Sequence, residues 1–194
     1  MATRSQSSAR EELLGMLIED HKRMKKAHRD FEKLDPESDR EARTAIVERT
    51  CAELEVHAQL EEELLYPAAR TKVAEDNLID EAEVEHQSAK QLIAQIKTMN
   101  PDDPKYSASF TVLCEYVKHH VREEEGELFP QLGRSRLDWI GMLETMVSRR
   151  RELMTEMGLL DESLVADAME DLEKNVKTPA ARRSGRAAGS TGNP

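Results

Sequence analysis

The sequence predicts an all-α protein: an up-down-up-down four-helix bundle, followed by one or two extra C-terminal helices and a disordered tail. Three observations support this fold class. Leu, Ala, Glu, Lys and Arg dominate the 194 residues while β-branched residues are sparse, a composition typical of helices. Apolar residues recur at intervals of three and four, which is the helical period. The two halves of the predicted bundle also resemble each other, as expected of two helical hairpins related by pseudo-twofold symmetry.

The predicted bundle covers residues 10–132 and follows a flexible N-terminus at residues 1–9. Its first helix covers about 10–34 and ends before Pro36, because a proline disfavours helical backbone at the residue before it. The other three helices are bounded by proline-containing segments in the same way. They cover about 40–66, 75–99 and 105–128, and end at Pro67, at segment 100–104 and at segment 129–130.

A helical extension is predicted at residues 133–176, because apolar residues keep the helical period over 135–157 and again over 161–175. The last segment, 177–194, is poor in apolar residues and rich in Gly, Ser and Arg. We interpret it as a disordered basic tail. Its arginines could contact an acidic partner or nucleic acid, but a solvated tail is the favoured interpretation.

The charge and the cysteines restrict the partners and the compartment. A formal net charge of -11 disfavours nucleic acid and anionic lipid as main partners, because both carry negative phosphates. The two cysteines, Cys51 and Cys114, lie far apart and outside any CxxC spacing, so no disulfide framework is indicated. The polar N-terminus shows no secretory signal, and no apolar run is long enough for a membrane span. We therefore expect a soluble cytoplasmic protein.

An internal repeat relates the two halves of the predicted bundle. A shift of 63 residues carries Val47, Thr50, Leu54, His57 and Glu61 onto Phe110, Leu113, Val117, His120 and Glu124, and likewise Cys51, Tyr66 and Pro67 onto Cys114, Phe129 and Pro130. A shift of 65 carries Leu14, Leu17, Asp20, His21 and Phe31 onto Ile79, Ala82, Glu85, His86 and Ile96.

Four histidines and two glutamates lie on the apolar faces of the four predicted helices: His21, His57, Glu61, His86, His120 and Glu124. Each glutamate follows a histidine by four residues, which places both side chains on one helix face about one turn apart. A single histidine at such a position is more often structural than a ligand. Six polar residues in symmetric register are different, because burying them is costly unless cations compensate them. Imidazole and carboxylate together suit iron, manganese or zinc.

These residues carry a family resemblance. The segments HAQLEEELLYP (57–67) and HHVREEEGELFP (119–130), with the acid–histidine pairs at 20–21 and 85–86, resemble the hemerythrin family, and more narrowly its bacterial HHE cation-binding domains. The resemblance covers about residues 10–132. It implies two iron ions, joined by an oxo or hydroxo bridge, in the core of a four-helix bundle, with manganese or zinc as possible substitutes. His21 and His57 would then bind one iron, His86 and His120 the other, and Glu61 and Glu124 would bridge them.

One position departs from the family's oxygen carriers. They have a fifth histidine four residues after the histidine of the third helix, and this sequence has Lys90 there. Losing a protein ligand leaves an extra coordination position for water, peroxide or another side chain. Redox turnover or iron sensing therefore gains weight over reversible O₂ carriage.

Three further residues are possible additional ligands or lie close behind the ligands. Tyr116 precedes His120 by one turn and could reach the metal, although an ordinary half-buried tyrosine is the alternative. Glu53 has the corresponding place before His57, where a surface glutamate is usual. His28 follows His21 by two turns, and core packing or a place behind the ligands is favoured over ligation.

The neighbours of the six residues receive structural interpretations. His119 faces away from the predicted site, so His120 is chosen as the ligand. Asp20 and Glu85 either accept hydrogen bonds from imidazole N–H groups or lie in solvent. The sequence further predicts solvated faces at Glu62, Glu63, Glu123 and Glu125, and packing at the bundle end by Tyr66 and Phe129.

The predicted function is that of a hemerythrin-like non-haem di-iron protein that binds or responds to O₂, peroxide or nitric oxide. Two alternatives remain open. One is an enzyme that disproportionates peroxide, although no catalytic side chain is assigned. The other is an iron storage or sensing module that acts through residues 133–194, where a protein partner or self-association is possible.

Overall fold

The computed structural model describes residues 5–72 and 77–160, and within these ranges every regular element is a helix. The chain divides into two compact units, Met1–Leu159 and Leu160–Pro194, and the account that follows concerns the first. The helix predicted at 161–175 and the tail predicted at 177–194 lie outside the described residues.

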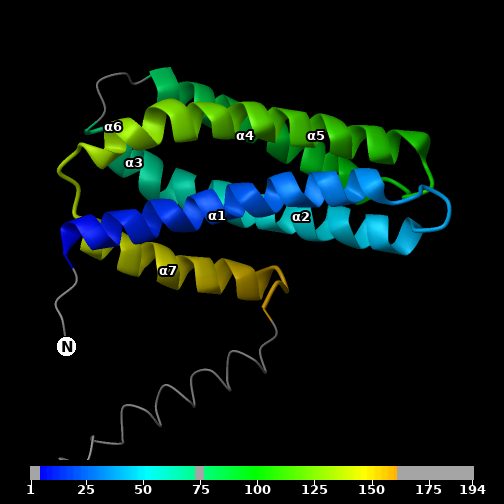
Figure 1. Ribbon diagram of the computed structural model, residues 1–194, viewed down its shortest axis with the longest axis horizontal. Coiled ribbons are helices and arrows are strands. Elements are labelled where there is room, and N and C mark those ends of the chain that lie inside the picture. Colours follow the sequence, from blue (N-terminus) through cyan, green and yellow to red (C-terminus); the bar gives the residue numbers. More distant parts are fainter. Residues whose placement is uncertain (1–4, 73–76, 161–194) are drawn as a thin grey trace, which may run out of the picture. The chain divides into compact units, whose positions relative to one another are not determined.

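Four long antiparallel helices form the predicted bundle: α1 (Gln6–Lys33), α2 (Arg40–Leu60), α4 (Asn77–Thr98) and α5 (Pro104–Glu123). Helix α1 contacts α2 and α5, and α4 contacts the same two helices from the other side, so each helix has two neighbours in the bundle (Figure 1). The all-α four-helix bundle predicted from the sequence is therefore confirmed.

Helix α1 begins at Gln6, four residues before the predicted start. Ser5 caps it, since its side-chain oxygen accepts a hydrogen bond from the amide of Ser8 at 3.1 Å. Ala9 is fully buried in the core at this end of the bundle. The prediction of a flexible start is thus wrong for residues 6–9. Their polar composition suggested a loose segment, but Ser5 caps a helix there.

The helical runs also continue past the two prolines that were predicted to end them. Short π-helical turns, η1 (Glu61–Leu65) and η2 (Glu124–Leu128), lead directly into α3 (Tyr66–Ala69) and α6 (Phe129–Gly133). In each turn an amide bonds the carbonyl five residues earlier, Tyr66 to Glu61 and Phe129 to Glu124. A proline lacks an amide hydrogen and its ring collides with the carbonyl one α-turn earlier, so the wider π-turn lets the helix continue.

Two apolar clusters fill the bundle, one toward each end. The first includes Leu13, Leu17, Leu60 and Leu128, and the second includes Met24, Leu54, Ile93, Phe110 and Leu113. Along α1 the buried residues between Leu17 and Met24 are polar, Asp20 and His21. A polar layer therefore separates the two clusters. The free thiols of Cys51 and Cys114 are buried in the second cluster.

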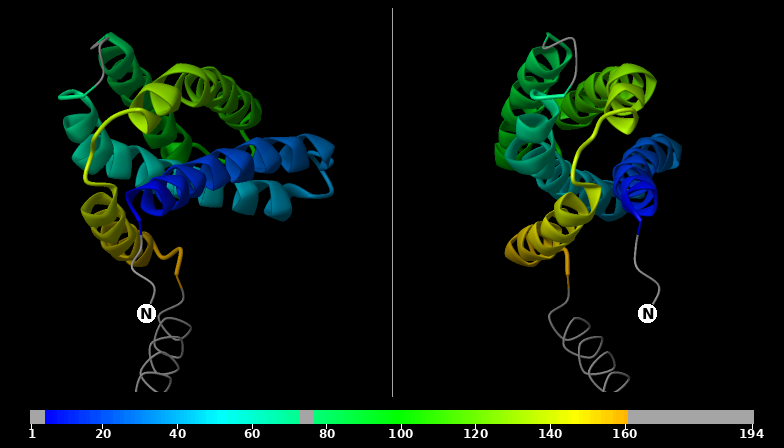
Figure 2. Two further views of the ribbon diagram at one scale, coloured as in Figure 1. Left: turned by 60° about the vertical axis from the view of Figure 1, so that its left-hand side comes forward. Right: turned by 90° about the vertical axis from the view of Figure 1, so that its left-hand side faces the viewer.

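Helix α7 (Trp139–Glu156) lies outside the bundle against α1 and α2 (Figure 2). Its buried face, Leu143, Met146 and Leu153, joins the first apolar cluster. At its start the Gln6 side-chain oxygen accepts a hydrogen bond from the Trp139 amide at 2.7 Å. The first of the predicted C-terminal helices is therefore confirmed. None of the helices in the described ranges has the length and apolar character needed to cross a membrane.

Candidate metal centre

The six predicted ligands come together in the polar layer. His21 lies on α1, His57 on α2, His86 on α4 and His120 on α5, while Glu61 and Glu124 are the first residues of the two π-turns. All six side chains are buried, with at most 6% of any residue exposed. Helix deviations of this π type often occur at functional sites, because they redirect side chains that a regular helix would point elsewhere.

The histidines form two pairs. The Nε2 atoms of His21 and His57 lie 3.2 Å apart, and those of His86 and His120 lie 3.1 Å apart. Two nitrogens bound to one ion at about 2.1 Å each, and roughly at a right angle, would lie ~3 Å apart. Each pair therefore has the spacing of two ligands on a common ion.

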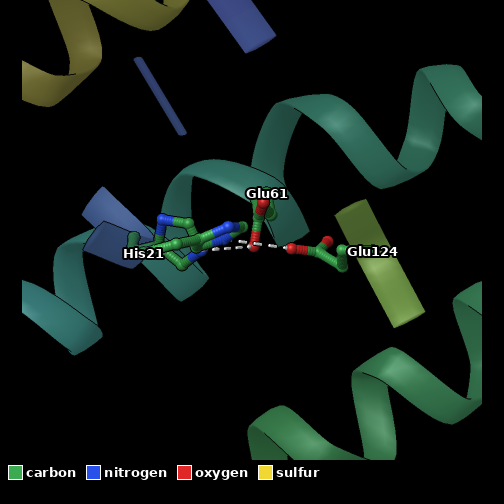
Figure 3. Close-up of side chains that lie close together, drawn as sticks. His21, Glu61 and Glu124 are labelled. Carbon is green, nitrogen blue, oxygen red and sulfur yellow. Dashed lines mark hydrogen bonds and ion pairs between the residues drawn. The ribbon is translucent and has the colours of Figure 1, made fainter. Parts of the chain in front are cut away.

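The glutamates lie between the two pairs. Glu61 Oε2 is 3.2 Å from His57 Nε2 and 3.6 Å from His86 Nε2. Glu124 Oε2 is 3.4 Å from the Nε2 atoms of both His21 and His120. Figure 3 shows His21, Glu61 and Glu124 pointing toward one another. Each carboxylate thus contacts one histidine of each pair, which is the position of a bridging ligand.

Each histidine is held from behind by a carboxylate. The Nδ1 atoms of the four imidazoles bond to four acids on neighbouring helices: His21 to Glu125 (2.8 Å), His57 to Asp20 (3.3 Å), His86 to Glu62 (3.1 Å) and His120 to Glu85 (3.0 Å). An imidazole that donates from Nδ1 keeps the lone pair of Nε2 directed inward, as a metal ligand requires.

The four acids had different predicted roles. Asp20 and Glu85 have the hydrogen-bonding role that was one of their two predicted alternatives. Glu62 and Glu125 were predicted on solvated faces, but both contact imidazoles and are only about one-third exposed. The runs of consecutive glutamates in the sequence give no basis for choosing these two. Glu63, in contrast, lies on the surface and pairs with Arg149.

The cluster attracts positive charge. Burial lowers the pKa of the His57 imidazole, but the carboxylates of Glu61 and Asp20 outweigh this effect and raise it to about 10. Burial opposes ionisation of Glu124, yet His120 and His21 hold the pKa of that carboxyl well below its ordinary value. Glu61 Oε1 is buried without a hydrogen-bond partner in the described part of the chain. Cations would compensate both the charge and the unpaired oxygen, so the residues fit a metal site.

Tyr66 is a further site residue that the sequence interpretation missed. It was predicted to pack the bundle end, but its buried hydroxyl lies 3.0 Å from Glu124 Oε1, 3.4 Å from His86 Nε2 and 3.5 Å from Glu61 Oε2. Its ring stacks on His86 with the centroids 5.5 Å apart. Burial and the nearby carboxylates raise the pKa of Tyr66 well above its ordinary value, so its hydroxyl donates to Glu124.

Phe129, the repeat partner of Tyr66, stacks on His21 in the same way. The two ring centroids are 5.9 Å apart and the ring planes differ by 8°. The repeat therefore places an aromatic ring against one histidine of each pair, but only the ring against His86 carries a hydroxyl.

The remaining candidates lie outside the cluster. Tyr116 is half exposed, and no hydrogen bond links it to the six residues within the described ranges. Glu53 pairs with Arg49 at 2.8 Å and Arg23 at 3.6 Å. His28 is buried beside Phe110, and neither ring nitrogen has a hydrogen-bond partner in the described part of the chain. His119 is exposed, which agrees with the choice of His120, and forms a surface group with Glu85 and Glu123.

Lys90 occupies the place of the missing fifth histidine. Its Nζ bonds to Glu62, the carboxylate behind His86, at 2.5 Å. Lys90 and Tyr116 also line a cavity of about 30 Å³ that is mostly apolar and is bordered by His57, His86 and His120. Since a water molecule needs roughly 10–15 Å³ on this measure, the cavity has room for a diatomic molecule or peroxide. It touches both histidines of the second pair and only His57 of the first.

The comparisons with known proteins agree with this geometry. The family described as the Hemerythrin HHE cation binding domain matches residues 12–132. A solved structure of a hemerythrin HHE cation binding domain-containing protein from Mycobacterium kansasii has the same fold, with a TM-score of 0.61 and 22% identity over 72% of this chain and 85% of that one.

A curated relative, a DNA nickase from Nostoc sp., is 38% identical over 77 residues. That match covers 40% of this chain and 22% of the nickase, so the chain spans only about a fifth of that protein's length. The family match, in contrast, spans more than half of the chain and includes all six cluster residues. The chain belongs to the hemerythrin HHE cation-binding domain family and is a metal-binding hemerythrin-like protein.

Proposed function

We propose that the six buried side chains hold two iron ions and that the centre binds or reacts with O₂, peroxide or nitric oxide. His21 and His57 serve one ion, His86 and His120 serve the other, and Glu61 and Glu124 bridge them. The contact of each glutamate with one histidine of each pair supports this assignment. Bridged iron ions supply reversible electron transfer and a coordination position for a small ligand.

The observation that carries the ligand class is the small cavity beside the second pair of histidines. Both glutamates contact each pair, Glu61 through His57 and His86 and Glu124 through His21 and His120, so the two positions share their carboxylates. The cavity of about 30 Å³ borders the second position. Its size suits a diatomic or peroxide, and its mostly apolar lining suits an uncharged ligand.

Tyr66 supports a second candidate, the disproportionation of hydrogen peroxide to water and O₂. Its hydroxyl lies beside the second position, keeps its proton and donates a hydrogen bond to Glu124. Peroxide turnover requires protons to be delivered to and removed from oxygen atoms. A buried phenol that is hydrogen-bonded to a carboxylate can relay such a proton.

The proposal is tested first by metal content and colour. Protein reconstituted with Fe²⁺ under anaerobic conditions and then exposed to air should contain about two irons and show an iron charge-transfer band. Glu61→Ala should lose both, because it removes a donor from each position. Glu53→Ala is the matched control: this glutamate lies on α2, two turns before Glu61, and its ion pairs in the described part of the chain are with Arg23 and Arg49. Colourless protein that retains no iron would overturn the proposal.

The reaction is tested next. Oxygen evolution from added peroxide that is lost in Glu61→Ala and reduced in Tyr66→Phe would favour the enzyme. Tight, reversible binding of O₂ or nitric oxide without turnover would favour the carrier or sensor. Stoichiometric retention of many irons per chain would instead favour storage.

We propose no role in DNA cleavage. The nickase activity belongs to a relative of which this chain matches 22%. The strongly negative net charge opposes contact with a phosphate backbone, and catalysis on DNA has no support in the buried geometry of the cluster.

A further inference from the structure

We infer that Arg150 of α7 positions the metal ligand His57 by holding the carboxylate of Asp20. Metal binding and the packing of α7 against the bundle therefore stabilise each other. The inference rests on the proposed role of His57 as a metal ligand. It does not depend on which small molecule the centre binds or transforms.

A continuous chain of contacts joins α7 to the metal cluster. Arg150 donates two hydrogen bonds to the Asp20 carboxylate, from Nη1 to Oδ2 at 2.7 Å and from Nη2 to Oδ1 at 2.5 Å. Asp20 Oδ2 in turn lies 3.3 Å from His57 Nδ1. A two-pronged guanidinium–carboxylate contact fixes the plane of the carboxylate as well as its position. Arg150 therefore restricts the direction in which Asp20 holds the imidazole.

The other three carboxylates behind the histidines are held differently. Each is 24% to 34% exposed at its side chain, and each pairs with a cationic or histidine side chain of the bundle itself: Glu125 with Lys25, Glu62 with Lys90 and Glu85 with His119. The side chain of Asp20 is only 5% exposed. Arg23 of α1 also contacts Asp20, but among the four carboxylates only Asp20 has an ion-pair partner outside the four-helix bundle within residues 5–72 and 77–160. The repeat partner Glu85 has no such contact with an added helix in the described residues.

The energetic consequence follows from the burial of Asp20. Removing one partner of a buried ion pair is strongly unfavourable, because the remaining charge loses its compensation. Partners behind a metal-bound histidine commonly change metal affinity 10–100-fold, because they set the orientation and basicity of the imidazole. If Arg150 strengthens metal binding, thermodynamic linkage requires that metal binding strengthens the docking of Arg150 by the same factor.

Three consecutive arginines on α7 make the test specific. Arg150 contacts Asp20, Arg149 pairs with the surface residue Glu63, and Arg151 is exposed and forms no ion pair in the described part of the chain. The variants Arg150→Met, Arg149→Met and Arg151→Met therefore remove the same charge from neighbouring positions. The apolar face of α7 (Leu143, Met146 and Leu153) remains, so we expect all three variants to fold.

The first measurement is an anaerobic Fe²⁺ titration against a competing chelator. Arg150→Met should weaken iron binding about tenfold or more, within the range for partners behind metal histidines. Arg151→Met should bind as the wild-type protein does, and Arg149→Met should change little. Arg150→Lys, which keeps the charge but not the two-pronged contact, should fall between Arg150→Met and the wild type. This variant also serves as the test if Arg150→Met does not fold.

The second measurement is hydrogen exchange of the α7 amides with and without Fe²⁺. Iron should slow exchange across α7 in the wild type and in Arg151→Met, and this effect should shrink in Arg150→Met. The coupling would be overturned if both Arg150 variants bound iron as tightly as the wild type, or if iron did not change the amide exchange rate of α7 in the wild type. Either result would leave the metal assignment intact. Failure of the wild-type protein itself to bind iron would overturn the assignment, and the coupling with it.

Discussion

The two halves of the metal cluster are built from one repeated pattern but have different surroundings. At the first position, His21 and His57 are joined by both glutamates, Phe129 covers His21, and α7 reaches His57 through Asp20. Among the described residues, this position is therefore the one that an added helix supports.

At the second position, His86 contacts Glu61 and His120 contacts Glu124. Tyr66 covers His86 and adds a hydroxyl, and the small cavity lies alongside. Under the proposed assignment of two metal ions, this comparison predicts a division of labour, in which the first position mainly stabilises the fold and the second admits a small ligand.

The largest expected effect distinguishes the two positions directly. His86→Ala leaves the second position with one histidine and the two shared glutamates, while the first keeps both of its histidines. We expect this variant to retain about one iron per chain. Metal analysis should show the loss, and electron paramagnetic resonance should show an isolated ferric ion in place of a coupled pair. Retention of both irons, or loss of both, would contradict the independence of the first position.

Removing the metal should destabilise the whole bundle. A ligand that binds only the folded state adds about 4 kcal/mol at a free concentration 1,000 times its dissociation constant. For a chain of this size that corresponds to a Tm decrease of roughly 8–16 °C when the metal is removed. Thermal unfolding followed by circular dichroism, before and after chelation, measures the difference. An unchanged Tm would show that the cluster folds equally well without ions.

A pair of aromatic exchanges tests whether the hydroxyl makes the second position reactive. Tyr66→Phe removes the phenol beside His86 but keeps the ring that stacks on it, so stability should change by only about 1 kcal/mol. Any peroxide turnover should fall, and the optical spectrum should shift if the phenol binds iron. Phe129→Tyr is the reciprocal variant, which places a hydroxyl near His21. An effect of equal size from both variants would mean that the two positions are chemically equivalent.

Much of this site follows from the sequence. The period of three and four, together with the two shifts of the internal repeat, predicts the bundle and all six residues that the structure brings together. The choice of His120 over His119 also agrees with the structure, because the repeat sets the helix face. These features depend on regular helical geometry, which a sequence pattern records well.

The features that were missed arise where the helix is irregular or where neighbouring residues are identical. In a regular α-helix Tyr66 would point roughly 140° away from Glu61, five residues earlier. The π-turn brings Tyr66 back to the helix face of Glu61, and no sequence pattern predicted that turn. The run of glutamates at 61–63 conceals the role of Glu62, and the run of arginines at 149–151 conceals that of Arg150. Such choices are settled by contacts between helices, which the order of residues does not contain.

The smallest expected effect concerns Lys90, which lies beside the second position where the family's oxygen carriers have a fifth histidine. Hydrogen bonding to His86 lowers the pKa of Glu62 to about 2 despite burial, and Lys90 contributes further. Lys90→Met should leave the Glu62–His86 bond in place, and because the pair is partly exposed, stability should fall by at most about 1 kcal/mol. Iron content should stay at two, while entry of a ligand to the cavity should become faster as the lysine is replaced by a flexible apolar chain. Stopped-flow binding of nitric oxide measures that rate, with Lys97→Met, which breaks a surface pair with Glu55, as the control. Loss of iron in Lys90→Met would show instead that the lysine maintains the ligand His86, and that the second position depends on its surroundings as strongly as the first depends on α7.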